Sequence, residues 1–103
     1  MTRKLNFEAI PWTESLPGAR SKNWADNKRR VRILELTDDF VEPDWCPKDH
    51  VLYVISGDVE IEFAGNREQF KTGDAAVIAR GDKHKARALT PTARLLLIEE
   101  VNP

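Results

Sequence analysis

Residues 44–57 read D-W-C-P-K-D-H-V-L-Y-V-I-S-G, and the interpretation of the chain starts from this stretch. It holds the only cysteine, Cys46, one of the two histidines, His50, and an apolar strand-like run that ends at Gly57. The second histidine, His84, follows the turn-like R-G-D-K. Cysteine thiolate and imidazole are the side chains that bind borderline metals such as zinc and iron. The stretch therefore predicts a strand with a candidate metal site beside it.

Strand patterns continue on both sides of this stretch. Residues 59–63 alternate apolar and acidic side chains, which is typical of a strand with one solvated face. Gly65 and Asn66 form a two-residue hairpin signal, and further turn signals recur at 72–74, 80–82 and 90–92. Eight or nine short strands without helical periodicity predict an all-β antiparallel fold, most economically a jelly-roll barrel, the double-stranded β-helix.

Residues 1–28 lack this periodicity. Trp24 is the only large apolar side chain of residues 21–27, so we expect a loop anchored by its indole ring. A chain of 103 residues has room for one core. We therefore predict a single domain over 1–103, with an irregular arm at 1–28 and a barrel at 29–101. The basic run at 28–30 is interpreted as a solvated start of the first barrel strand.

Composition and charge exclude several classes of function. The net charge is −1 and both signs are interspersed, which indicates neither a nucleic-acid partner nor a membrane surface. The apolar runs are too short to span a bilayer, and Glu8 interrupts the N-terminus before the apolar region of a signal peptide forms. One cysteine cannot form an internal disulfide, so we expect a reducing, cytoplasmic location.

The residues around Gly57 resemble the first motif of the cupin family. That motif has two alternating histidines, a glutamate and, after six further residues, a glycine. Aligning its glycine with Gly57 places His50 at the glutamate position. The same alignment places Asp44 and Cys46 at the two histidine positions. The stretch is similar to uncharacterised cupins that carry W-C and a following histidine in place of H-x-H.

The second cupin motif is similar to residues 73–84, which run from Gly73 through Gly81 to His84. Ala79 stands where the family has proline, and Ala88 stands where it has asparagine. The resemblance covers residues 29–101. It implies a small single-domain cupin of the conserved-barrel superfamily.

The resemblance also implies a set of residues that face one cavity inside the barrel: Asp44, Cys46, His50 and His84. Cysteine and two histidines, with Asp44 as a fourth candidate ligand, suit a divalent metal such as zinc, iron, nickel or manganese. A second interpretation stays open. A free cysteine also packs as a small hydrophobe, and buried histidines are satisfied by hydrogen bonds, which would give a pocket without a metal.

Two functions follow from the resemblance. The first is a barrel that binds a small molecule without catalysis. The second is a metal-dependent enzyme, of dioxygenase, isomerase or decarboxylase type, that acts on a small metabolite. Both rest on analogy at the level of the fold, and one fold hosts many functions.

Two segments, 31–36 and 95–98, carry apolar side chains on both faces. A barrel interior buries only one face of a strand, so the other face needs a cover. We predict a homodimer, in which a second copy covers this face and Leu34 lies at the contact. The alternative is that the N-terminal segment folds back over the same face.

Overall fold

The computed structural model describes residues 2–101 as two antiparallel sheets that enclose one core. The larger sheet has the strand order β1-β2-β3-β9-β4-β7 and the smaller one β6-β5-β8. The strands are β1 Thr13–Leu16, β2 Ala19–Ala25, β3 Arg29–Thr37, β4 His50–Ser56, β5 Val59–Phe63, β6 Asn66–Phe70, β7 Ala75–Ile78, β8 His84–Ala88 and β9 Thr92–Glu100. A short 3-10 helix, η1 Phe7–Ala9, precedes them. The all-β jelly-roll prediction is confirmed.

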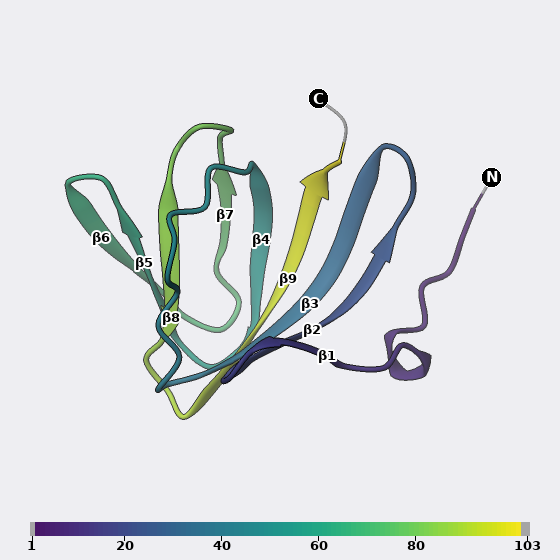
Figure 1. The fold of residues 1–103 in the computed structure, drawn as a ribbon, viewed down its shortest axis with the longest axis horizontal. Coiled ribbons are helices and arrows are strands. Elements are labelled where there is room, and N and C mark those ends of the chain that lie inside the picture. Colours follow the sequence, from purple (N-terminus) through teal and green to yellow (C-terminus); the bar gives the residue numbers. More distant parts are fainter. Residues whose placement is uncertain (1, 102–103) are drawn as a thin grey trace.

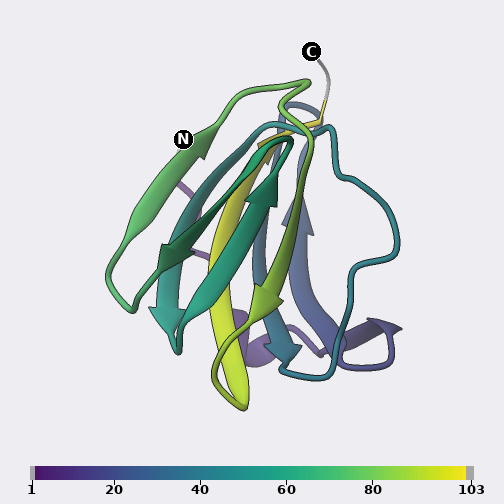
Figure 2. The same cartoon turned by 90° about the vertical axis from the view of Figure 1, so that its left-hand side faces the viewer.

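Figure 1 shows the two sheets converging at one end of the barrel and diverging at the other. The starts of β3, β4 and β8 and the end of β9 all lie at the open end, which is the upper end in this view. Figure 2 shows the same opening from the side, with the loop of residues 38–49 running along one edge of the barrel. The open end is the place where side chains from both sheets can meet.

The core lies between the sheets and follows the period of two that strands impose on their side chains. In β4 the inward side chains, His50, Leu52 and Val54, are buried, while the alternating outward ones are exposed. Leu95 and Leu97 of β9 point into the same core. Leu34 also packs against this core, so the prediction that it lies at a contact between copies is wrong.

The expected irregular arm is wrong for residues 13–25, which form β1 and β2 of the larger sheet. The predicted loop at 21–27 is largely β2, which pairs along its whole length with β3. Its inward positions are small or polar, as Ser21 is, and its outward ones are Arg20, Lys22 and Trp24. Such a strand has no apolar alternation, so its pairing with β3 is what forms it.

The turn between β4 and β5 depends on Gly57, whose φ is +79°. This left-handed conformation disfavours residues with a Cβ atom. A Cβ atom there would also lie 2.5 Å from the backbone oxygen of Thr92.

Within residues 2–101, no helix is long and apolar enough to cross a membrane.

Candidate metal centre

Three of the four predicted ligands meet at the open end of the barrel. The candidate donor atoms of Cys46, His50 and His84 all lie within 4.8 Å of one another. Both histidines are buried and Cys46 is half-buried. The three side chains line an inner cavity of about 140 Å³. The structure therefore brings together the cysteine and the two histidines that the sequence singled out.

Each of the three residues comes from a different part of the fold. His50 begins β4 in the larger sheet, and His84 begins β8 in the smaller one. Cys46 lies outside the named strands, but its backbone forms an isolated antiparallel bridge with His84. The two hydrogen bonds of this bridge measure 2.9 and 3.1 Å between nitrogen and oxygen. The bridge fixes Cys46 beside His84 of the smaller sheet, and the larger sheet supplies His50.

Asp44 lies outside this group. Its side chain is exposed, and residues 38–45 contain no strand. Residues 44 and 46 would face the same side only in an extended strand, which this segment does not form. Pro43 precedes Asp44. Within residues 38–49, only Cys46 forms a backbone bridge with β8. The structure does not support Asp44 as a fourth ligand.

The neighbours of His84 determine which of its ring nitrogens carries the proton. Its Nδ1 lies 3.0 Å from the backbone oxygen of Asp82, which can only accept a hydrogen bond. Nδ1 therefore carries the proton and donates it to that carbonyl. In the neutral ring this leaves the lone pair on Nε2.

His50 is held by Glu99, a residue that the sequence interpretation missed. Nδ1 of His50 lies 2.9 Å from Oε2 of Glu99, although the approach is not aligned as a hydrogen bond. Two lone pairs at this distance would repel, so Nδ1 carries the proton and the pair is a close electrostatic contact. Nε2 of His50 is then free, and it lies 3.4 Å from Sγ of Cys46.

Two arginines of β3 hold Glu99 from its other side. Arg30 places Nη2 2.8 Å from Oε1 of Glu99, and Arg32 places Nε 3.4 Å from the same oxygen. Burial raises the pKa of Glu99, but the contact with His50 and the charges of the two arginines outweigh it and lower the pKa to about 2. Glu99 is therefore an anion at neutral pH, although its side chain is 2% exposed.

The interpretation of residues 28–30 as a solvated basic run is wrong for Arg30, which is half-buried. Arg30 and Arg32 share the inward face of β3 with Leu34 and Leu36. Burial is also the main cause that lowers the pKa of Arg32. The signal was available in the sequence. Leu95 and Leu97 share a face with Glu99, so the inward direction of β9 carries Glu99 into the barrel.

The donor set suits a tetrahedral metal such as zinc. Zinc bonds of about 2.0–2.3 Å place neighbouring ligand atoms roughly 3.5 Å apart, and the Cys46–His50 pair already has this spacing. The widest separation in the group, 4.8 Å at most, requires a side-chain movement of about 1 Å. The carboxylate behind His50 is the arrangement that orients metal-bound histidines. The residues present therefore fit a metal.

The cupin domain family matches residues 41–99 of this chain. The chain belongs to the cupin family. This match covers more than half of the sequence and includes all three members of the Cys46, His50 and His84 group. No curated protein sequence matches the chain.

Solved structures of other cupin-fold proteins resemble this one closely. KdgF from a Halomonas species has a TM-score of 0.85 and 22% identity, covering 100% of this chain and 96% of its own. The polyketide cyclase RemF from Streptomyces resistomycificus has a TM-score of 0.81 and 18% identity, covering 99% and 81%. The iron(II) form of HppE has a TM-score of 0.80 and 11% identity, covering 95% and 60%. At these identities the likeness shows the fold alone.

Proposed function

We propose that this cupin binds a divalent metal, zinc or ferrous iron, through Cys46, His50 and His84. The observation that carries the proposal is the protonation pattern of the two rings. Each Nδ1 faces a fixed acceptor, the carboxylate of Glu99 or the carbonyl of Asp82, which leaves each Nε2 for a metal. Nickel and manganese remain alternatives, and the thiolate favours the softer zinc and iron.

A small-molecule ligand would share the barrel with this metal. Three protein ligands leave one position of a tetrahedral site open. The inner cavity that surrounds the three side chains provides the space for that position. In this proposal the primary function is binding of a small molecule.

A metal-dependent enzyme of dioxygenase, isomerase or decarboxylase type is the alternative function. The polyketide cyclase RemF shares the fold, which supports an enzyme only by analogy. An open metal position is also what a Lewis-acid catalyst requires. We retain the cytoplasm as the proposed location, because a thiolate ligand needs reducing surroundings.

Metal analysis of protein purified without a histidine tag tests the proposal. We expect close to one equivalent of zinc or iron, and loss of zinc in the Cys46→Ser variant because a hydroxyl is a poorer zinc ligand than a thiolate. In cobalt-loaded protein, the sulfur-to-metal charge-transfer absorption should disappear in the same variant. Protein that takes up no metal after reconstitution, or a Cys46→Ser variant with unchanged zinc affinity, would contradict the proposal.

We also propose a homodimer through the outer face of the larger sheet. Cross-strand neighbours form one apolar row there, Val31, Ile98, Val51 and Val77, and a second row, Ile33, Leu96, Tyr53 and Ala75. Val77 is 83% exposed and Val51 46%. The pairs Arg29–Glu100 and Glu35–Arg94 border the rows. An uncharged patch with charged borders is self-complementary, as a two-fold contact requires.

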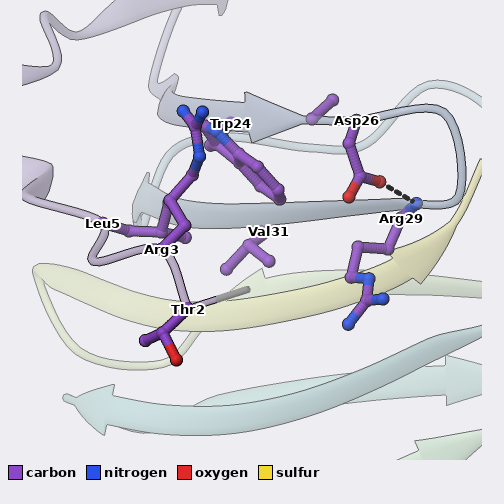
Figure 3. Close-up of a pocket in the computed structure, with 8 residues that line it drawn as sticks. Thr2, Arg3, Leu5, Trp24, Asp26, Arg29 and Val31 are labelled. Carbon is purple, nitrogen blue, oxygen red and sulfur yellow. Dashed lines mark hydrogen bonds between the residues drawn. The ribbon is translucent and has the colours of Figure 1, made fainter.

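The N-terminal arm that precedes β1, residues 2–12, covers only one end of this face. Figure 3 shows Arg3 and Leu5 of the arm facing Trp24 and Val31 across a cleft of about 680 Å³. Trp12 lies on Arg20, 4.2 Å from its guanidinium carbon. The rows beyond Val31 remain exposed at Val51, Tyr53 and Val77. This distribution favours a second copy of the chain, rather than the N-terminal segment, as the cover of this face.

A further inference from the structure

A second cavity adjoins the metal centre at the open end of the barrel. This rim groove has a volume of about 440 Å³ and is formed by the segments around Pro47–Asp49, Arg80–Gly81 and Glu100–Val101. Arg30 and Lys48 line both the rim groove and the inner cavity. The two spaces therefore meet at these two cations.

Positive charge is in excess around the inner cavity. Its lining includes the cations Arg30, Arg32 and Lys48 and the anions Glu42 and Glu99. Glu99 is engaged by both arginines, and Glu42 accepts a hydrogen bond from the backbone nitrogen of Ala86 at 3.1 Å. Within this lining, three cations against two anions leave one positive charge without a partner. A ligand with one negative charge would balance it. In the adjoining rim groove, Asp49 and Glu100 both lie near Arg80, 3.3 and 3.7 Å from its Nη2.

Two of these cations have unused hydrogen-bonding capacity. Nε of Arg32 is buried and has no hydrogen-bond partner, although it lies 3.4 Å from Glu99. Buried donors in native proteins are nearly always satisfied, so an acceptor on a bound ligand would complete the hydrogen bonding of this N–H. Lys48 is exposed and forms no ion pair within residues 2–101. Both groups can donate to an anionic ligand.

The size of the inner cavity limits what enters it. Liquid water occupies about 30 Å³ per molecule, so a cavity of 140 Å³ holds roughly four or five non-hydrogen atoms. This is enough for one end of a metabolite, such as a carboxylate and its neighbouring carbon. A longer molecule has to continue past Arg30 and Lys48 into the rim groove.

We propose that the ligand of this barrel is a small organic carboxylate, with its anionic end held by Arg32 and Lys48 and its remainder in the rim groove. The planar guanidinium group matches the two oxygens of a carboxylate. The inference deepens the proposed function, because it names the class of ligand for the same cavity. Its charge argument uses side chains alone and does not depend on the metal.

Calorimetric titration with a matched pair of probes tests the charge requirement. Lactate and lactamide have nearly the same shape, and only lactate is an anion. We expect lactate to bind at least tenfold more tightly, and its affinity to fall with added salt because screening weakens charge interactions. Equal affinities for the two probes would overturn the inference. Tighter binding of inorganic phosphate than of lactate would also overturn it.

The Lys48→Gln variant tests the position of the anion. Lys48 is exposed and unpaired, so the change leaves the fold intact and should lower lactate affinity about threefold to tenfold. Lys71→Gln is the matched control, because Lys71 is also exposed and lies outside both cavities. Equal losses in the two variants would show that only overall charge matters and would overturn the assignment.

The rim groove is tested by ligand length. 2-Hydroxyhexanoate carries the same anionic end as lactate and a longer tail, so it should bind more tightly to the native protein. Val101→Ser removes apolar surface from the groove without adding a charge, so it should reduce this advantage and leave lactate affinity unchanged. An undiminished advantage in Val101→Ser would overturn the placement of the tail.

The two proposals fail in different ways. Zinc binding is measured first by equilibrium dialysis, and the lactate titrations are then repeated on zinc-loaded and on chelator-treated protein. Lactate binding without zinc binding would contradict the metal centre and support the carboxylate site. Zinc binding with no lactate binding in either form would support the metal centre and overturn the carboxylate site.

Discussion

Nδ1 of His50 lies 2.9 Å from Oε2 of Glu99, and this contact joins β4 to β9 inside the barrel. Glu99 in turn contacts Arg30 and Arg32 of β3. One carboxylate therefore fixes the orientation of a candidate metal ligand and neutralises two inward-pointing cations. Changing Glu99 should affect metal affinity and fold stability together.

We predict that Glu99→Gln lowers zinc affinity about 10- to 100-fold, as loss of a carboxylate behind a metal-bound histidine typically does. The change also leaves Arg30 and Arg32 without their anion, so the metal-free protein should lose stability. Competition with a chromogenic chelator measures the first effect, and denaturant unfolding of metal-free protein measures the second. Glu100→Gln is the control, since Glu100 lies on the opposite face of the same strand. Equal zinc affinities in the two variants would contradict the role of Glu99.

The dimer prediction concerns Val77, which is 83% exposed on the outer face of the larger sheet. Val77→Glu should convert a dimer of twice 11.8 kDa into a folded monomer, because a charge buried at the contact would have no partner. Light scattering coupled to gel filtration measures the mass. Val41 is 79% exposed but lies outside the larger sheet, so Val41→Glu should leave the dimer unchanged. A native protein of monomer mass would rule out the dimer.

The turn at Gly57 predicts a difference between two glycines. Gly57→Ala should lower the free energy of unfolding by about 1–3 kcal/mol, because of its positive φ and the nearby oxygen of Thr92. Gly65 also has a positive φ, +91°, but a Cβ atom there meets nothing within 4 Å. Gly65→Ala should therefore cost less, about 1 kcal/mol. Denaturant unfolding of both variants compares them, and equal losses would contradict the steric argument.

The pH prediction concerns Glu35, which bridges Arg20 and Arg94 with nitrogen–oxygen distances of 2.7 Å on either side. The hydrogen bond from Arg20 is the main cause that lowers the pKa of Glu35 below its usual 4.5. A lowered pKa in the folded state stabilises the protein above pH 4.5, and this contribution is lost as pH falls through the lowered pKa.

Glu35→Gln should accordingly be less stable than the native protein at pH 7, by about 1 kcal/mol. The difference should shrink as pH falls below 4.5, because Glu35 is protonated first in the unfolded state and, below the lowered pKa, in the folded state as well. Unfolding curves from pH 7 to pH 3 measure the difference. Glu14→Gln is the control, since Glu14 is exposed and forms no ion pair in the described part of the chain. A difference independent of pH would contradict the assignment.

The barrel strands could be predicted because their side chains alternate. Val59–Phe63 shows its two faces in the sequence itself, and the structure has a strand with the same bounds. Strand β2 could not be found in this way, because Ser21 and Lys22 make both of its faces polar. Its hydrogen bonds come from β3, and sequence patterns do not report a pairing partner.

The sequence predicts the site residues whose types are rare in this chain and misses those whose types are common. One cysteine and two histidines drew attention by their type, and they converge. Glu99 and Arg30 are common residue types, and their inward direction depends on which face of β3 and β9 the second sheet covers. Asp44 was misplaced because a motif alignment assumes a strand that this segment does not form.

The position of the three donors has a mechanical consequence. His50 belongs to one sheet and His84 to the other, and the two imidazole rings stand 4.9 Å apart between them. The sheets diverge toward this end of the barrel (Figure 1). A metal on these donors would join the two sheets at the open end of the barrel, so the sheets could not separate there until the metal–ligand bonds broke.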